Sequence, residues 1–123
     1  MALVLAVDDS RFSRSRVVSA LKEGGHDVIE AADGIEGFRA VEEHNPDVVV
    51  TDLLMPNCDG IEQLRKIRDA GMTVPVIIVS ADIQQTSRDM CEELKAFAFL
   101  NKPFDKQDLN NKVASALVQT SGV

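Results

Sequence analysis

The sequence predicts a single α/β domain built on a parallel sheet. Five short apolar runs alternate with amphipathic stretches along the 123 residues, which is the pattern of strands joined by crossover helices. The run at residues 48–51 shows no alternation with polar residues, so this strand is expected to be buried on both faces. Several runs also stop abruptly at a polar residue. We therefore expect a doubly wound five-stranded sheet with five helices and one core.

The first half of the chain supplies three strands and two helices. The strands are residues 3–7, a short run around Val28-Ile29, and residues 48–51. The first helix follows Ser10, a suitable N-cap, and stops at Gly24-Gly25. The second follows Asp33-Gly34 and ends at Asn45-Pro46. The apolar faces expected of these helices are Val17, Ala20, Leu21 and Gly24 in the first, and Ile35, Phe38 and Val41 in the second.

The second half adds two strands and three helices. A third helix follows Gly60 and closes at Gly71. The fourth strand covers residues 74–80, a more polar helix covers about 84–95, the fifth strand covers 97–100, and the last helix covers roughly 106–118. The apolar stripes expected are Ile61, Leu64 and Ile67, then Ile83, Met90 and Leu94, then Leu109, Val113 and Leu117.

Composition narrows the possible partners. The net charge of −7 argues against nucleic acid or an anionic membrane surface, and is compatible with a bound cation or a basic protein patch. No apolar stretch is long enough to span a membrane, and the first residues lack the basic start of a signal peptide. Cys58 and Cys91 have neither metal-ligand spacing nor a disulfide framework, so we expect two reduced thiols in a cytoplasmic protein.

Four of the five strands end in polar side chains of reactive types. These are Asp8 with Asp9, then Asp52, then Ser80, and Lys102 after Asn101. In a parallel sheet these ends share one edge, and the acids converge if the first and third strands are neighbours. Three close carboxylates need a hard cation, and oxygen ligands without His or Cys indicate Mg²⁺.

This set of side chains is suited to phosphoryl transfer onto a carboxylate. Asp52 would be the nucleophile, and it needs no general base because it is already ionised near neutral pH. Lys102 and the metal would neutralise charge on the phosphoryl oxygens, and Ser80 would donate a hydrogen bond. Taken singly, Asp52 could be a turn residue, Ser80 structural and Lys102 solvated, so the argument depends on their sharing one edge.

Four motifs carry a resemblance to a known family. They are residues 7–11 (VDDSR), 52–60 (DLLMPNCDG), 75–81 (PVIIVSA) and 99–104 (FLNKPF). In their order and spacing the chain resembles a response-regulator receiver domain of two-component signalling, similar to chemotaxis regulators. The resemblance implies a flavodoxin-like fold with strand order 2-1-3-4-5. It also implies a receiver domain over residues 1–119, leaving 120–123 as a polar tail or the start of a linker.

The resemblance implies a role for each matching residue. Asp52 would accept phosphate from a histidine kinase, a phosphotransfer protein or a small phosphodonor. Asp8, Asp9, Asp52 and the backbone carbonyl of Leu54 would hold Mg²⁺, for which Mn²⁺ could substitute. Lys102 would contact the phosphoryl group, and Pro103 would follow it, often through a cis bond. Ser80 and Phe99 would form the switch that alters the surface of the fourth helix, fifth strand and last helix, and so controls a partner protein or a fused output domain. The domain would act as a monomer or as a phosphorylation-dependent dimer.

Several readings stay open at this level. Phe99 could simply pack in the core, and it lacks the hydroxyl of the Tyr common in this family. The resemblance implies that Leu54 and Asp82 occupy positions that would flank the phosphoryl group and influence its lifetime. Lys95 stands where many members have Gly, so we expect a different helix end there. Arg11, Arg14 and Arg16 could form a solvated face or a kinase-docking surface. The alternatives to a signalling switch are a Mg²⁺-dependent phosphatase or phosphotransferase using a covalent aspartyl phosphate, and a degenerate receiver that only mediates protein contacts.

Overall fold

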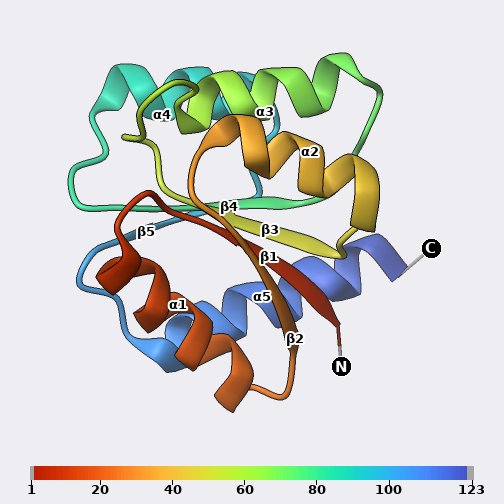
Figure 1. The fold of residues 1–123 in the computed structure, drawn as a ribbon, viewed down its shortest axis with the longest axis vertical. Helices are drawn as coiled ribbons and strands as arrows, with labels where there is room; N and C mark the ends of the chain where they lie inside the picture. Colours follow the sequence, from red (N-terminus) through yellow and green to blue (C-terminus); the bar gives the residue numbers. More distant parts are fainter. Residues whose placement is uncertain (1, 122–123) are drawn as a thin grey trace.

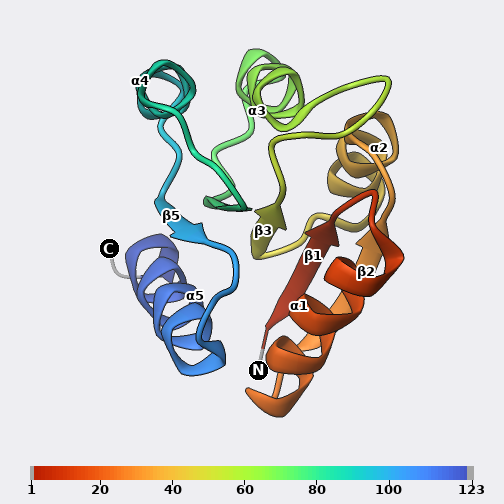
Figure 2. The ribbon, with the colours of Figure 1, turned by 90° about the vertical axis from the view of Figure 1, so that its left-hand side faces the viewer.

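The computed structural model describes residues 2–121, with side chains described for residues 2–118, and it contains the predicted doubly wound sheet. The strands are all parallel, in the spatial order β2-β1-β3-β4-β5. Their bounds are β1 Leu3–Val7, β2 Asp27–Ala31, β3 Val48–Thr51, β4 Val76–Ser80 and β5 Ala98–Asn101. The helices are α1 Arg11–Glu23, α2 Gly34–His44, α3 Gly60–Asp69, α4 Gln85–Glu93 and α5 Lys106–Ser121. Helices α2, α3 and α4 cover one face of the sheet, and α1 and α5 cover the other (Figures 1 and 2).

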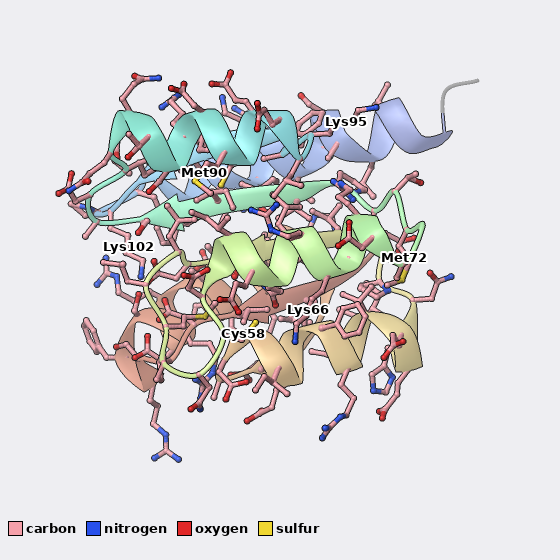
Figure 3. The ribbon with its side chains drawn as sticks, turned by 90° about the horizontal axis from the view of Figure 1, so that it is seen from above. Cys58, Lys66, Met72, Met90, Lys95 and Lys102 are labelled. Carbon is pink, nitrogen blue, oxygen red and sulfur yellow. The ribbon has the colours of Figure 1, made fainter. Side chains whose placement is uncertain are left out.

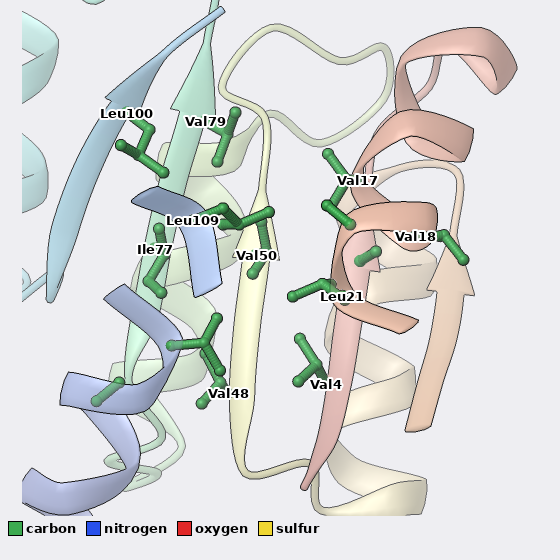
Figure 4. Close-up of a cluster of buried hydrophobic side chains, with 14 residues drawn as sticks. Val4, Val17, Val18, Leu21, Val48, Val50, Ile77, Val79, Leu100 and Leu109 are labelled. Atoms are coloured by element: carbon green, nitrogen blue, oxygen red, sulfur yellow. The ribbon is translucent and has the colours of Figure 1, made fainter. Parts of the chain in front are cut away.

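The core consists of two layers, one on each face of the sheet. Successive residues of a strand point to opposite faces, so an apolar run contributes to both layers. In β3, Val48 and Val50 face α1 and α5 together with Val4, Leu21 and Leu109 (Figure 4). The intervening Val49 faces the other layer, with Leu5, Leu64 and Ile78. Burial on both faces explains why the central strands β1, β3 and β4 are almost entirely apolar, whereas the edge strand β2 carries the exposed Asp27 and Glu30. The continuous sheet forms a rigid support for the residues that follow each strand.

The predicted apolar faces of α2 and α4 are correct except at one residue in each, since Val41 is buried and Phe38, Ile83 and Leu94 pack against the same core layer. Ile35 is 42% exposed, and α2 instead buries Gly34, Gly37 and Val41. A Cβ atom on Gly37 would overlap the Gln63 side-chain oxygen, so glycine at this position leaves room for the buried Gln63 side chain between α2 and α3. Met90 is 41% exposed, and α4 buries Cys91 in its place. The predictions for Ile35 and Met90 were wrong because small residues, Gly34, Gly37 and Cys91, occupy the closely packed positions.

Helix α4 is shorter than predicted and is anchored at its C-terminal end. Lys95 adopts the left-handed conformation, with φ of 61°. The backbone N–H of Lys95 donates to Glu92 and that of Ala96 donates to Cys91, which is the Schellman arrangement that normally favours glycine. The expectation of a different helix end was therefore wrong: the chain keeps the glycine-type geometry with a lysine.

A single arginine ties this helix end to α3. The Arg68 guanidinium, on α3, donates hydrogen bonds of 2.8–3.1 Å to four backbone carbonyls. Two of these carbonyls, those of Leu94 and Lys95, follow α4, and the other two lie in the segment between α3 and β4, at Met72 and Val74. The C-terminal ends of α3 and α4 are thus joined at one edge of the sheet.

The last helix is longer than predicted. It continues through Ser121, so residues 120 and 121 of the expected tail are helical, whereas residues 122 and 123 lie outside the described part of the chain. The domain boundary placed at residue 119 stays a prediction. Across residues 2–121, none of the helices combines the length and the apolar character that crossing a bilayer demands.

Candidate functional site

Strand register brings the predicted site residues together. Val7 of β1 pairs with Thr51 of β3, so the residues that follow them, Asp8 and Asp52, leave neighbouring strands at the same level. The Asp52 backbone N–H donates to the Val7 carbonyl at 3.0 Å. On the other side of β3, Ser80 ends β4 and its carbonyl accepts the Lys102 backbone N–H at 2.9 Å. All four side chains therefore lie at the carboxyl edge of the sheet.

Lys102 lies between two of the carboxylates. Its Nζ donates to Asp8 Oδ2 and to Asp52 Oδ2, each at 2.8 Å. The Lys102 side chain is 19% exposed, and the two carboxylate side chains are 5% and 12% exposed, so these ion pairs are largely shielded from water. Burial alone would lower the pKa of Lys102, but the hydrogen bonds and negative charges of Asp52 and Asp8 outweigh it and raise that pKa. Lys102 is therefore a fixed positive charge. Its peptide bond to Pro103 is cis.

The second oxygen of the Asp52 carboxylate is bound by donors from both sides. Ser80 Oγ donates to Asp52 Oδ1 at 2.7 Å. The backbone N–H groups of Leu53 and Leu54 point to the same oxygen, at 2.6 and 3.4 Å. A turn residue would account for these backbone bonds but not for the convergence of Ser80 and Lys102 from distant parts of the chain. The carboxylate is held in one orientation by groups from three loops.

The acidic residues have the composition of a hard-cation site. Carboxylate oxygens of Asp8, Asp9 and Asp52 lie within 4.8 Å of one another. Against their three negative charges, Lys102 supplies one positive charge in direct contact, so these four groups carry two uncompensated negative charges. Asp8 is buried and Asp9 is exposed, which leaves one side of the cluster open to solvent. An all-oxygen, solvent-accessible set of this kind fits Mg²⁺.

One residue at the site was not predicted from the sequence. Arg14 had been considered only as part of a solvated or docking surface, but its side chain is 16% exposed. Its Nη1 donates to the Asp8 backbone carbonyl at 2.6 Å, and its Nε donates to Glu30 at 2.9 Å. Arg14 therefore braces the loop that carries both N-terminal acids. A helix-periodicity argument could have placed it toward the strand, one turn before Val17 and Val18.

Phe99 lies behind the site, on the α4 side of the sheet. It is half-buried against the core layer under α2, α3 and α4. The Arg88 guanidinium of α4 stacks over its ring, 4.4 Å from the centroid. Leu54 and Asp82, at the positions expected to flank a phosphoryl group, are both exposed, Leu54 by 72%. The aromatic ring is held by a cation rather than through a ring hydroxyl.

The remaining α1 arginines border an exposed aromatic surface. Arg11 and Arg16 are exposed, and Arg16 lies 5.8 Å from the ring centroid of Phe12, which is itself 73% exposed. A surface pocket of about 420 Å³ is lined by Phe12, Ser13, Arg16, Lys102, Pro103 and Phe104. This pocket adjoins the candidate site through Lys102. Figure 3 shows Lys102 at one end of the molecule, with Met72 and Lys95 at the opposite end.

The two cysteines have no part in the site. Both are free and buried, and burial raises the pKa of each thiol, that of Cys91 to about 11. A buried thiol with a raised pKa stays protonated and unreactive.

The fold is that of a doubly wound α/β domain with an acidic cluster at the carboxyl edge of its sheet, and the comparisons identify the family. The family model for the response regulator receiver domain matches residues 4–114. The chain belongs to this family and is a receiver domain of two-component signalling. The predicted family and the predicted fold are both confirmed.

Three curated relatives illustrate the range of proteins that contain such a domain. The chain is 33% identical over 119 residues to Protein PilH of Pseudomonas aeruginosa, covering 95% of this chain and 98% of PilH. It is 31% identical over 114 residues to the alkaline phosphatase synthesis transcriptional regulatory protein PhoP of Bacillus subtilis, covering 93% of this chain and 48% of PhoP. It is 44% identical over 110 residues to protein-glutamate methylesterase/protein-glutamine glutaminase 2 of Koribacter versatilis, covering 86% and 30%. The chain thus spans less than half the length of the last two proteins.

Two solved structures share the fold over almost the whole chain. The Francisella response regulator 1452 receiver domain superposes with a TM-score of 0.90 at 30% identity, covering 98% of this chain and 99% of that one. The receiver domain of the sensor histidine kinase PA1611 from Pseudomonas aeruginosa has a TM-score of 0.84 at 27% identity, covering 94% and 97%. The PA1611 structure has a magnesium ion coordinated in its active site cleft.

Proposed function

We propose that this receiver domain is switched by phosphorylation of Asp52. The donor is a histidine kinase, a phosphotransfer protein or a small phosphodonor. The observation that carries the proposal is the pair of donors on the Asp52 carboxylate: Lys102 Nζ at 2.8 Å on one oxygen and Ser80 Oγ at 2.7 Å on the other. Both donors carry hydrogens that a phosphoryl group on Asp52 can accept in place of the free carboxylate.

The transfer itself needs little from the protein beyond positioning and charge. A carboxylate oxygen of Asp52 attacks the phosphorus of the donor, and a new O–P bond forms as the P–N bond of a phosphohistidine breaks. The electron pair of that bond stays on the imidazole nitrogen, which takes its proton from the solvent. For acetyl phosphate the broken bond is P–O and acetate leaves. Lys102 and Ser80 then donate to the phosphoryl oxygens, where negative charge has accumulated.

Asp8, Asp9, Asp52 and the Leu54 carbonyl are the proposed Mg²⁺ ligands, with Mn²⁺ as a substitute. The support is the all-oxygen cluster within 4.8 Å and its two uncompensated negative charges. The bound ion would supply positive charge to the phosphoryl oxygens. Arg14 supports the same loop by holding the Asp8 carbonyl.

The proposed output is a change on the surface formed by α4, β5 and α5. Phosphorylation adds about −1.5 to −2 charges at pH 7. Ser80 and Lys102 both contact the Asp52 carboxylate, so they must change position when they donate instead to a larger and more negative phosphoryl group. Lys102 follows β5 and Ser80 ends β4, so the movement is passed to the segments that flank Phe99. A partner protein or a fused output domain would bind this surface and respond to its change.

The proposed docking surface for the phosphodonor is the pocket beside α1. It combines the exposed ring of Phe12 and the partly buried ring of Phe104 with the cation of Arg16, and it reaches Lys102. A donor protein that places its phosphohistidine over Asp52 would meet this surface. Its matching face should be apolar with acidic residues at the margin, because the exposed Arg11 and Arg16 are positive.

The test is phosphorylation by a small donor, followed by intact mass. With Mg²⁺ and acetyl phosphate, the protein should gain the mass of one phosphoryl group, and EDTA should abolish the gain. Asp52→Asn should take none, whereas the control Asp27→Asn should match the unmodified protein, because Asp27 is exposed at the start of β2 and loses the same charge far from the site. An adduct that persists in Asp52→Asn would contradict the assignment of Asp52.

A further inference from the structure

A fully buried glutamine lies beneath the site. Gln63 of α3 is 0% exposed, although glutamine is rarely buried without a partner. Its Nε2 donates to Thr51 Oγ1 at 2.9 Å, and Thr51 is itself 1% exposed. The other end of the amide, Oε1, has no hydrogen-bond partner within the described part of the chain. A buried acceptor without a partner destabilises a fold, so this residue is not explained by stability alone.

The hydrogen bonds run in one direction, from Gln63 to Asp52. A threonine hydroxyl has one hydrogen to donate. Because Gln63 Nε2 occupies an acceptor position of Thr51 Oγ1, the hydroxyl hydrogen points elsewhere, and it is donated to the Asp52 backbone carbonyl at 2.9 Å. Without Gln63 this hydroxyl would be free to rotate away from the carbonyl.

The Asp52 carbonyl belongs to the peptide group that orients the Asp52 side chain. The N–H of the same peptide, from Leu53, donates to Asp52 Oδ1 at 2.6 Å. The next carbonyl, of Leu53, accepts the Gly60 N–H at 2.8 Å, and a Cβ on Gly60 would come within 2.3 Å of the Asp52 carbonyl oxygen. The plane of this peptide is therefore held on its carbonyl side by Thr51 and on its N–H side by the carboxylate that would be phosphorylated.

We propose that Gln63, acting through Thr51, is a positioning residue for the Asp52 carboxylate. This inference rests on the proposed phosphorylation of Asp52. A rotation of the peptide would move the Leu53 N–H away from Oδ1, and the carboxylate would lose one of the donors that fix its orientation. The competing explanation is that Gln63 only fills the space beside Gly37. The two explanations predict different outcomes when the amide is removed and the volume is kept.

The experiment compares Gln63→Met with Gln107→Met, a control at an exposed position of α5. Phosphorylation by acetyl phosphate with saturating Mg²⁺ is followed by intact mass, and unfolding by urea is followed by circular dichroism. We expect Gln63→Met to be phosphorylated about threefold to tenfold more slowly, the loss due to one hydrogen bond. Its stability should be unchanged or higher, because the orphan acceptor is removed. The control should match the unmodified protein in both measurements.

Thr51 provides a second route to the same question, which holds even if Gln63→Met folds poorly. Thr51→Val removes the hydroxyl and should slow phosphorylation to a similar extent. Thr51→Ser keeps the hydroxyl and should be phosphorylated at the rate of the unmodified protein. Because the two residues act in one chain of hydrogen bonds, Gln63→Met combined with Thr51→Val should be no slower than the slower single variant.

Three results would overturn the inference. The first is a phosphorylation rate in Gln63→Met equal to that of the unmodified protein. The second is a rate in the double variant equal to the product of the two single effects. The third is equal rates in Thr51→Val and Thr51→Ser. In each case the unmodified protein still takes up phosphate, so the proposed function stands. Failure of the unmodified protein to take up any phosphate would overturn both.

Discussion

Replacing Lys102 by methionine tests whether its charge holds the acidic site together. The substitution keeps the aliphatic stem and removes the ammonium that lies 2.8 Å from both Asp8 and Asp52. At that distance each pair attracts by about 6 kcal/mol at an effective dielectric constant of about 20, most of which is offset by desolvation. Breaking a largely buried pair costs about 3 kcal/mol net, because the carboxylates are left together without a counter-charge. We therefore expect Lys102→Met to lose about 3 kcal/mol of unfolding free energy in EDTA.

Added Mg²⁺ should restore this variant more than it stabilises the unmodified protein. In Lys102→Met the site carries three negative charges, whereas in the unmodified protein it carries a net charge of two, so the variant should bind Mg²⁺ more tightly. Each tenfold fall in the Mg²⁺ dissociation constant adds about 1.4 kcal/mol of stabilisation when the ion is in excess. Urea unfolding followed by circular dichroism measures both effects, since the chain has no Trp or Tyr to report by fluorescence.

The matched control is Lys106→Met. Lys106 pairs with Glu23 at 3.0 Å, but these side chains are 64% and 59% exposed, so the loss should be less than about 1 kcal/mol. Equal losses in the two variants, or an equal response to Mg²⁺ in Lys102→Met and the unmodified protein, would refute the reasoning about the buried charges.

Three further predictions concern residues away from the acidic cluster. Lys95→Gly should raise the unfolding free energy by about 0.5–1 kcal/mol, because glycine adopts a φ of 61° without strain. The control Lys112→Gly, inside α5, should lower the unfolding free energy by about 1 kcal/mol. A loss of stability in Lys95→Gly would contradict this expectation. Arg88→Met should cost roughly 0.5–1 kcal/mol through loss of the cation stacked on Phe99, and an unchanged urea midpoint would show that the contact contributes nothing. Burial raises the pKa of Cys91 from 9.0 to about 11, so between these pH values the thiol ionises in the unfolded chain but not in the folded one. The unfolding free energy should therefore be unaffected by this thiol below pH 9.0 and should fall by about 3 kcal/mol at most as pH rises to 11. The unfolding free energy measured with urea from pH 8 to 11 should fall less steeply for Cys91→Ala than for the unmodified protein, although the variant is less stable at every pH. An equal slope in the two proteins would refute the assignment.

The features that followed from local pattern were the strands and the residues at their ends. Uninterrupted apolar runs indicated strands buried on both faces, and parallel topology then required Asp8, Asp52, Ser80 and Lys102 to share an edge. The resemblance supplied the strand order. These inferences needed only the direction of each strand and the point at which it ends, which are the properties that sequence periodicity describes well.

What the sequence could not provide was contact-level detail. The buried face of α2 is defined by Gly37 rather than Ile35, because the distance between two helices decides which side chain fits. Gln63 was not predicted as a site or core residue, and its burial becomes apparent only from its hydrogen bond to Thr51 across the interface. Arg14 is one of several arginines on a basic helix, and its spacing from Val17 and Val18 indicates the inner side of that helix but not the Asp8 carbonyl that it contacts.

The arginine that joins the ends of α3 and α4 determines how α4 is able to move. Four carbonyl bonds from Arg68 and the Schellman turn at Lys95 secure the C-terminal end of α4. At the other end, Gln84 provides no side-chain cap, and the chain leads directly back to Ser80. The helix is therefore anchored by several hydrogen bonds at the edge of the sheet far from Asp52, whereas at the near edge it has no side-chain cap and is held by the stacking of Arg88 on Phe99. If phosphorylation of Asp52 shifts Ser80 as proposed, the movement would reach the first turn of α4 before its last turn, and Arg68 would be the point about which the helix turns.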